Sequence, residues 1–176
     1  MVELVRQNKK VNDKLYKNTV REIRNKIGKN YPINHVGSTA LPNMYGKNII
    51  DILIGVEDVD DLNKITNELI DMGYCPGKNV SNNVCRFFAN TYEETKSGDI
   101  HIHVAIKNTE RYKGFIILRD YLLENKKERQ EYCAMKKKIL NLGHNEREDY
   151  KKIKADYVTE LLNRAMEWSK KNIENK

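Results

Sequence analysis

The first third of the chain changes from helical to strand-like spacing of its apolar residues. Through residues 3–27 these residues recur every three or four positions and Gly28 follows, which predicts a helix that ends there. YPINHVGS, residues 31–38, is predicted to be a short strand that ends in a Gly-Ser turn. NIIDILIGV, residues 48–56, is rich in β-branched residues and almost continuously apolar, which predicts a strand covered on both faces.

The middle of the chain repeats this change of spacing. Helical spacing returns over residues 60–72, with Asp58 or Asp60 placed to cap the helix. NVCRFFANTY (83–92) and DIHIHVAI (99–106) are then predicted to be two strands that pair with each other. The EETKSGD link between them contains a Ser-Gly pair and favours a hairpin turn.

The last third of the chain is predicted to be helical throughout. Helices are expected near 112–124, 126–141 and 146–172, and all three prolines lie before them. The order of elements predicts an α+β fold, a small mixed sheet with flanking helices and a helical C-terminal part.

No repeat, linker or break in composition divides the chain. Residues 1–176 are therefore expected to form one domain, with a core at about 30–106 and C-terminal helices at about 109–172.

The composition of the chain bears on where in the cell the protein is expected. No apolar run approaches the ~20 residues of a membrane-spanning helix, and the N-terminal residues lack the apolar core of a signal peptide. Cys75, Cys85 and Cys133 are widely spaced and form no CxxC, which indicates neither a disulfide framework nor a zinc site. We therefore expect a cytoplasmic protein with no membrane partner, and its oligomeric state stays open.

The net charge of +7 is unevenly distributed. Residues 1–34 carry nine Lys/Arg and three Asp/Glu, residues 35–106 carry five and ten, and residues 107–176 carry eighteen and twelve. One interpretation is a carboxylate site framed by basic helices that attract a polyanion. The other is that lysine-rich helices are simply solvated surfaces. Nucleic acid is a partner under the first interpretation, but the chain shows no aromatic platform or known motif for it.

Asp51 is a single carboxylate within the apolar segment IIDILIGV. A buried charge is costly unless it meets a partner, a metal or a cleft. Strand alternation places Asp51 and Leu53 on one face, so a leucine occupies the position that an Asp-x-Asp metal site needs for its second carboxylate. The structural alternative is that Asp51 pairs with a basic side chain or with backbone amides.

The turn Gly37-Ser38-Thr39 lies between the two predicted strands around it. A glycine after a strand lets the backbone approach a ligand, and the amides of such a turn can form an anion-binding nest. Ser38 and Thr39 add hydroxyl groups, Lys47 can offset phosphate charge, and His35 is a further candidate. The pattern is not a Walker loop, and an ordinary turn is the alternative.

A second group of candidates lies on the predicted strand 99–106. Asp99, His101 and His103 alternate along one face, while the residues between them are apolar and face the core. These three side chains can ligate a metal, bind phosphate or perform acid–base chemistry. The alternative is one packed and one exposed histidine.

Two arginines lie among apolar residues. Arg86 is on the strand expected beside His101 and His103, and such an arginine is usually ion-paired or aimed into a cleft. Arg119 is expected either to contact the site or to pair with Asp120. Four residues of the C-terminal helices are predicted to lie at the surface: Tyr132, Lys136, Tyr150 and Lys154.

Together these segments resemble the GrpB-like proteins. HVGSTALPNMYGKNIIDILIGV is similar to the family signature, which runs His-Val/Ile-Gly-Ser-Thr, a Pro, a Lys and Ile-Ile-Asp-Ile. HIHV and LRDYL follow in the family's order, the latter where the family usually has Phe-Arg-Asp-Tyr-Leu. The resemblance covers about residues 1–170 and includes further marks at Arg86, Phe87, Phe88, Tyr132, Lys136, Tyr150 and Lys154.

The GrpB-like family is similar in turn to the DNA polymerase beta-like nucleotidyltransferase superfamily, which implies an α/β core of that type. In active members the Gly-Ser turn holds the nucleotide's phosphates, and carboxylates on two strands hold two divalent ions. Carried over, the resemblance implies that Gly37 and Ser38 bind phosphate and that Asp51 binds Mg²⁺ or Mn²⁺. Ile49 and Leu53 depart from the pattern because neither is an acid.

Three functions stay open. The first is metal-dependent transfer of a nucleotidyl group to an unknown acceptor. Its catalytic residues would be Asp51 and His103, its metal ligands Asp51, Asp99, His101 and His103, and its ligand-binding residues Gly37, Ser38, Thr39, Lys47, Arg86 and Arg119. The second is a catalytically inactive module that binds a nucleotide or another phosphorylated small molecule. The third is a histidine-based phosphoesterase, although Ala105 stands where a third histidine would be expected.

Overall fold

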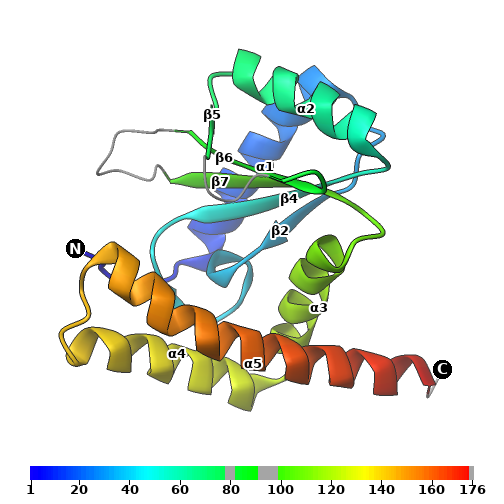
Figure 1. The fold of residues 1–176 in the computed structure, drawn as a ribbon. Helices are drawn as coiled ribbons and strands as arrows, with labels where there is room; N and C mark the ends of the chain where they lie inside the picture. Colours follow the sequence, from blue (N-terminus) through cyan, green and yellow to red (C-terminus); the bar gives the residue numbers. More distant parts are fainter. Residues whose placement is uncertain (78–81, 91–98, 175–176) are drawn as a thin grey trace.

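The computed structural model describes residues 1–77, 82–90 and 99–174, and it places a mixed sheet between two sets of helices (Figure 1). Only β4 and β7 are parallel neighbours, and the other adjacent strands of this sheet are antiparallel. The predicted α+β class is confirmed. The strand order is β2 (Ile33–Val36), β4 (Ile50–Val56), β7 (Ile100–Ile106), β6 (Cys85–Ala89) and β5 (Cys75–Pro76).

Helices α1 (Lys9–Ile27) and α2 (Val59–Asp71) cover one face of the sheet (Figure 1). Asn8 and Asp58 cap them, and each side chain accepts a hydrogen bond from a backbone amide of the first turn. Helix α1 begins later than the sequence predicted. The reason is that the preceding residues form β1 (Val5–Arg6), which pairs with β3 (Tyr45–Gly46).

The main core lies between these two helices and the sheet. Ile52 and Ile54 of β4 point into it together with Ile102 of β7, and all three are fully buried. Alternation then directs Asp51 and His101 toward the opposite face. Each fully buried aliphatic side chain contributes about 1.5–3 kcal/mol of stability, so the register of β4 is firmly set and with it the direction of Asp51.

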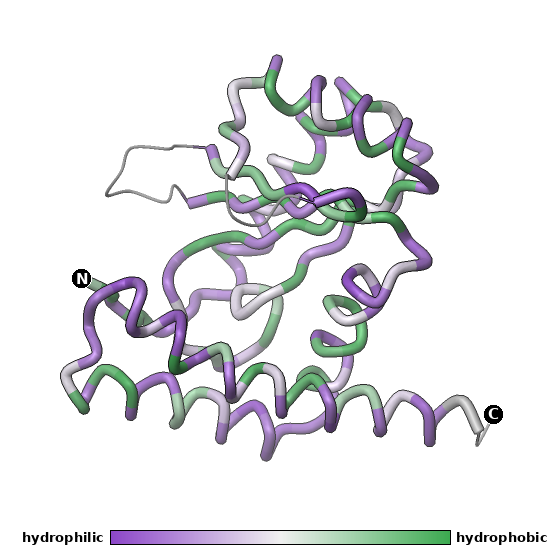
Figure 2. Tube along the Cα trace, in the orientation of Figure 1, coloured by the Kyte–Doolittle hydropathy of each residue, from purple (hydrophilic) through white to green (hydrophobic). Residues whose placement is uncertain are grey.

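The opposite side carries three C-terminal helices: α3 (Glu110–Glu124), α4 (Lys126–Asn141) and α5 (Arg147–Glu174) (Figure 1). They form a second core, into which Leu41 and Met44 reach from the segment after the Gly-Ser turn. Figure 2 shows that hydrophobic and hydrophilic residues alternate along α4 and α5, whereas β4 and β7 are mostly hydrophobic. The second core therefore ties the turn and the C-terminal helices together.

The predicted strand pair β6–β7 forms in antiparallel register, from Cys85 opposite Ala105 to Ala89 opposite His101. The hairpin turn predicted between these strands lies outside the described residues. Within the part of the chain that the structure describes, no helix has both the length and the apolar character needed to cross a bilayer.

Candidate functional site

Asp51 lies beside the Gly-Ser turn because of strand pairing. It is opposite Val36 on β2 and opposite His101 on β7. Strand β2 ends at Val36, so the next residues, Gly37 and Ser38, pass next to the Asp51 carboxylate. Gly37 has φ 72° and ψ −169°, and a Cβ there would lie 2.9 Å from Asp51 Cγ. A glycine is therefore required for this approach.

Asp51 forms an ion pair with His101. Nδ1 of His101 lies 3.5 Å from Asp51 Oδ1, and the two side chains are 15% and 27% exposed. Burial by itself raises the pKa of Asp51, but the hydrogen bond with His101 and the electrostatic interactions with His101, His103 and Lys154 together lower it. Asp51 is therefore ionised at neutral pH.

His103 points to the same face but is packed among aromatic rings. Its ring centroid lies 5.2 Å from that of Phe87 and 4.6 Å from that of Phe115. Its Nδ1 is buried without a hydrogen-bond partner among the described residues. Burial lowers the pKa of His103 to about 4, so the imidazole is neutral at physiological pH.

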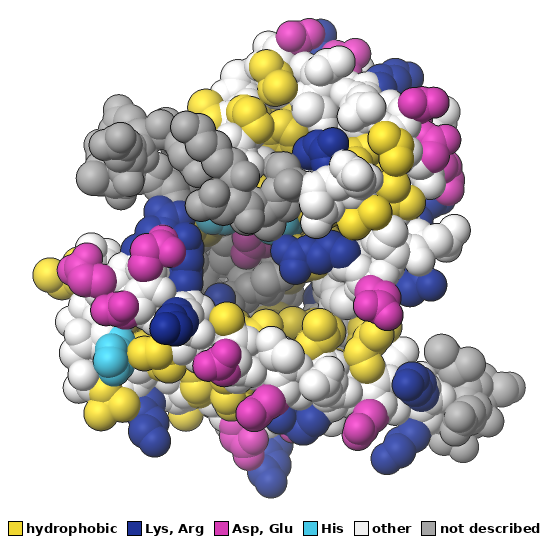
Figure 3. Space-filling view, in the orientation of Figure 1, with side chains coloured by type: hydrophobic (Ala, Val, Ile, Leu, Met, Phe, Trp, Pro, Cys, Tyr) yellow, Lys and Arg dark blue, Asp and Glu magenta, His cyan; other side chains and the backbone are white. Residues whose placement is uncertain are grey.

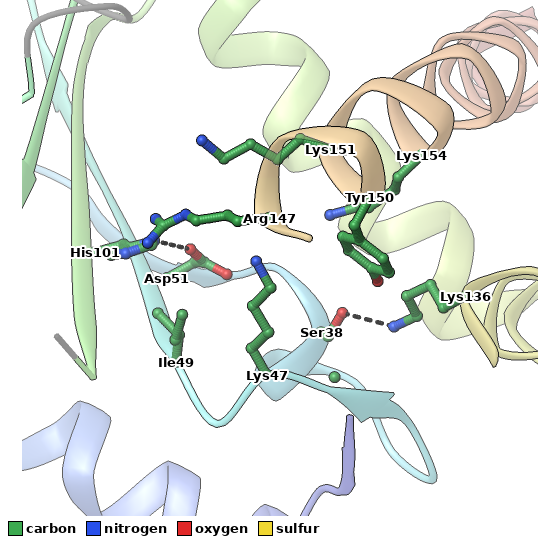
Figure 4. A pocket seen from close by; sticks show the side chains of 11 residues that line it. Ser38, Lys47, Ile49, Asp51, His101, Lys136, Arg147, Tyr150, Lys151 and Lys154 are labelled. Atoms are coloured by element: carbon green, nitrogen blue, oxygen red, sulfur yellow. Dashed lines mark hydrogen bonds and ion pairs between the residues drawn. The ribbon is translucent and has the colours of Figure 1, made fainter. Parts of the chain in front are cut away.

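Five basic side chains, hereafter the basic cluster, line one cavity with Asp51 (Figure 4). They line a cavity of about 200 Å³ together with Ser38, His101 and Tyr150, and Asp51 is the one carboxylate among the described residues that line it. The cluster comes from three parts of the chain: Lys47 before β4, Lys136 on α4, and Arg147, Lys151 and Lys154 on α5. Figure 3 shows the molecule hollowed between the sheet and the C-terminal helices, with Lys and Arg side chains beside the opening.

Two lysines of the basic cluster are partly neutralised by their surroundings. Burial lowers the pKa of Lys47 to about 8, with further contributions from Arg147, Lys154 and Lys151. Burial also lowers the pKa of Lys136 to about 8. The pKa of Lys154 is instead raised, chiefly by electrostatic interaction with Tyr132. The cavity therefore holds a strong positive charge at neutral pH that weakens toward pH 8 and above.

The prediction that Tyr132, Lys136, Tyr150 and Lys154 lie at the surface was wrong. Tyr132, Lys136 and Tyr150 are only 7%, 2% and 2% exposed, and Lys154 lines the cavity. The sequence did carry a signal, because each lysine lies in the apolar stripe of its helix. The stripes are Tyr132, Lys136 and Ile139 on α4, and Tyr150, Lys154, Tyr157 and Leu161 on α5.

A second cavity of about 240 Å³ adjoins the first and shares Ser38, Asp51 and Lys154 with it. Its wall is largely apolar, with His103 and Arg119 as polar members, and the apolar residues are Leu41, Phe115, Leu118, Leu122 and Val158. Both alternatives for Arg119 hold, because its Nε also donates a hydrogen bond of 2.7 Å to Asp120 Oδ1.

Arg86 and Asp99 are not brought into this group. Arg86 is opposite Val104, which places it on the sheet face covered by α1 and α2. Asp99 is exposed immediately before β7, where its carboxylate accepts a hydrogen bond from the Asn90 amide. The expectation for Arg86 rested on the pairing of its strand with that of His101 and His103, and the face that it occupies follows only once the register is known. The expectation for Asp99 rested on strand alternation, but the strand begins after it.

Thr39 and His35 support the turn from behind. The Thr39 hydroxyl is buried, donates to the Ile49 carbonyl at 3.2 Å and lies 3.0 Å from His35 Nε2. The His35 ring stacks on Tyr16, and burial lowers the pKa of His35 to about 4. Both side chains therefore hold the turn in place and do not line either cavity.

The donor set does not fit a pair of metal ions. Among residues 1–77, 82–90 and 99–174, no three His, Cys, Asp or Glu side chains are placed to hold a metal. Leu53 is fully buried against Val36, Cys85 and Ala105, so no ligand stands there. The five surrounding cations would also repel a second divalent ion.

The mixed sheet, the Gly-Ser turn and the acidic strand beside it define a nucleotidyltransferase-like fold. The solved structure of the Cid1 poly(U) polymerase with MgGTP bound has this fold, with a TM-score of 0.50 and 10% sequence identity. The match covers 73% of this chain and 42% of that chain. At this identity the likeness shows the fold alone.

The chain belongs to the GrpB family, because the family profile described as GrpB protein matches residues 1–164. It is 34% identical over 133 residues to the glutamate-rich protein GrpB of Alkalihalophilus pseudofirmus, which covers 74% of this chain and 76% of that protein. The crystal structure of the conserved protein GrpB from Enterococcus faecalis has a TM-score of 0.80 at 20% identity, covering 95% of this chain and 99% of that one. These comparisons confirm the resemblance seen in the motifs.

Proposed function

We propose that the protein binds a nucleotide or another phosphate-containing small molecule in the cavity around Asp51. The observation that carries this proposal is the convergence of the basic cluster with Ser38 on one small cavity. The Gly37-Ser38 turn and the basic cluster would hold the phosphates, and the non-phosphate part of the ligand would extend into the adjoining apolar cavity.

The charge balance favours a ligand with more than one negative charge. Five basic side chains face a single carboxylate, so the cavity keeps a positive excess even when Lys47 and Lys136 are partly deprotonated. Lysine presents a compact charge with three rotatable donors, which suits tetrahedral phosphate oxygens. For the C-terminal basic flank, residues 107–176, this geometry favours the polyanion interpretation over the interpretation as solvated surface.

The basic cluster also bears on the metal question. In this proposal its side chains neutralise the phosphates. The residues that the structure describes offer no group of side chains that would hold a pair of metal ions for this purpose. A Mg²⁺ or Mn²⁺ ion that arrives with a nucleotide would find Asp51 as its one carboxylate in the cavity.

Nucleotidyl transfer is the second candidate function, favoured by one observation. Asp51 is ionised and lies against the Gly-Ser turn. In this proposal its carboxylate would act on a nucleotide whose phosphates are bound at the turn. His103 lines the adjoining cavity in its neutral form and would be its partner. A histidine-based phosphoesterase has less support, because Phe87 and Phe115 enclose His103.

Calorimetric titration with inorganic tripolyphosphate and with a nucleoside triphosphate tests the proposal. Lys154→Met should weaken both affinities about tenfold or more, since a charge-assisted hydrogen bond contributes about 1.5–3 kcal/mol. Lys152→Met is the matched control, because Lys152 is exposed on the same helix and does not line the cavity. Equal affinities of the two variants, or no binding by the wild type, would contradict the proposal.

Asp51→Asn distinguishes phosphate binding by the basic cluster alone from phosphate binding through a metal ion held by Asp51. If the basic cluster alone holds the ligand, removal of the carboxylate charge leaves tripolyphosphate affinity unchanged or raises it, with or without EDTA. If a metal bridges Asp51 and the phosphates, the same variant loses its Mg²⁺-dependent affinity.

A further inference from the structure

Ser38 and Lys136 form a contact that phosphate binding alone does not require. Nζ of Lys136 lies 3.1 Å from Ser38 Oγ, and both side chains line the cavity of the basic cluster (Figure 4). Lys136 is 2% exposed, whereas Ser38 is half-buried and reaches both cavities. The hydroxyl is therefore accessible to a ligand while the amine lies behind it.

The other neighbours of Lys136 hold its amine in one orientation. Nζ donates a hydrogen bond to the Tyr45 carbonyl and lies 4.5 Å from the centroid of the Tyr132 ring. A neutral amine has two N–H donors and one lone pair. In the structure Nζ donates to Ser38 Oγ, as a protonated amine does. Once Lys136 loses a proton, the carbonyl and the aromatic face can keep its two N–H groups, which leaves the lone pair for the Ser38 hydroxyl proton. An activated serine has a base within hydrogen-bonding distance and a further group that orients the base. Lys136 and its two other neighbours match this arrangement around Ser38.

The groups that face Lys136 favour its neutral form. Tyr132 and Cys133 face it from α4, Tyr45 from β3, and Tyr150 and Lys154 from α5. Burial, followed by the charge of Lys154, lowers the pKa of Lys136 to about 8, and Cys133 opposes this effect. A substantial fraction of the amine is therefore unprotonated at mildly alkaline pH.

We propose that Ser38 is a nucleophile with Lys136 as its general base, and that it accepts a phosphorus-centred group from a phosphoanhydride ligand. The Ser38 Oγ–P bond forms as the bond from that phosphorus to the bridging oxygen breaks, and the remaining phosphate portion leaves with the electron pair. The hydroxyl proton moves to Nζ of Lys136, which becomes an ammonium. The proposal rests on the proposed phosphate-binding function for its natural donor, a nucleoside triphosphate.

The rest of the basic cluster is placed to stabilise such a step. Lys47, Arg147 and Lys154 line the cavity that Ser38 faces, so they can neutralise the phosphorus-bound oxygens and the leaving phosphate. Asp51 lines the same cavity. Lys136 is the member of the cluster that forms a hydrogen bond with the serine itself.

The first test uses diisopropyl fluorophosphate, which labels an activated serine without needing nucleotide affinity. The wild type should be labelled at Ser38, as identified by peptide mass spectrometry. Labelling should be absent in Ser38→Ala and at least about 100-fold slower in Lys136→Met, the scale of general-base catalysis. Lys138→Met should label at the wild-type rate, because Lys138 is exposed on the same helix.

Lys136→Arg distinguishes a base from a positive charge that merely positions the serine. Arginine keeps the charge but does not deprotonate, so phosphate binding should persist while labelling falls as in Lys136→Met. In the wild type the labelling rate should rise with pH to a plateau with a midpoint near 8. The profile is repeated in Lys47→Arg, because Lys47 titrates in the same range. Wild-type labelling rates in Lys136→Arg, or a flat pH profile, would overturn the proposal.

The second test uses a nucleoside triphosphate labelled separately in its α- and γ-phosphates, with calorimetry and intact-protein mass spectrometry in parallel. The expected result is a covalent adduct on Ser38 whose label shows which phosphorus was attacked. Binding without an adduct and without fluorophosphate labelling would overturn the nucleophile proposal and leave the binding function standing. Fluorophosphate labelling without nucleotide binding would contradict the binding function instead.

Discussion

The Asp51 carboxylate lies directly over the Cα atom of Gly37. A Cβ at residue 37 would come 2.9 Å from Asp51 Cγ and closer still to Oδ2. This contact joins the acidic strand to the Gly-Ser turn. The carboxylate can lie this close to the turn because Gly37 has no Cβ.

Gly37→Ala should therefore damage both stability and binding. Its φ of 72° and ψ of −169° lie in a region that is essentially limited to glycine, which costs about 1–3 kcal/mol for other residues, and the clash with Asp51 adds to this cost. Urea unfolding and phosphate titration measure the two effects. Gly143→Ala is the matched control, because Gly143 also has positive φ but no atom within 4 Å of its Cβ position. A smaller loss of stability in Gly37→Ala than in Gly143→Ala would contradict this account.

Phosphate affinity should fall as pH rises through 8. Lys47 and Lys136 both have pKa values of about 8, and an anion binds more tightly to their protonated forms. Affinity is therefore expected to be constant below about pH 7 and to decrease above pH 8, measured by calorimetry at fixed ionic strength. Lys47→Arg should remove part of the decrease, since arginine stays charged. An affinity that rises with pH would be inconsistent with these assignments.

Folding stability should rise between pH 4 and pH 6.5. The pKa values of His35 and His103 are about 4 in the folded protein and 6.5 ordinarily, so in this window the unfolded chain binds more protons. The stabilisation is fully present above pH 6.5 and is lost as pH falls toward 4. Each histidine contributes on the order of 3 kcal/mol at most.

Urea unfolding at several pH values measures this slope. His103→Gln should flatten it, because glutamine does not titrate in the window. An equally steep slope in this variant would show that other groups cause the pH dependence.

A second carboxylate beside Asp51 should create a metal site, because no three His, Cys, Asp or Glu side chains of the described residues are placed to hold a metal. Ile49 lines the cavity with Asp51, so Ile49→Asp would place two carboxylates two residues apart at its edge. We expect this variant to bind Mn²⁺ more tightly than the wild type, measured by electron paramagnetic resonance. Leu53→Asp should instead destabilise the fold, because Leu53 is fully buried in an apolar cluster. Equal Mn²⁺ affinity in Ile49→Asp and the wild type would contradict this prediction.

Local sequence patterns predicted most of the elements. The end of α1 at Gly28, the start of α2 after Asp58 and the two long strands were predicted from periodicity and capping. Both signals involve neighbouring residues only. The two-residue strands β1 and β3 were not predicted, because their pairing joins residues about 40 positions apart and leaves no periodic signal.

By itself, the sequence determined the family and the α+β class, since these follow from a contiguous motif and from the spacing of apolar residues. The pairing of Val36 with Asp51 then placed the carboxylate beside the Gly-Ser turn. Tertiary structure alone decided which other lysines join Lys47 in the cavity around Asp51. Lys47, Lys136 and Lys154 are far apart in the chain, and the apolar stripes that contain Lys136 and Lys154 do not show that these lysines converge on one cavity. They meet because the second core packs α4 and α5 against the segment after Gly37, and this packing buries the Lys136 amine beside Ser38.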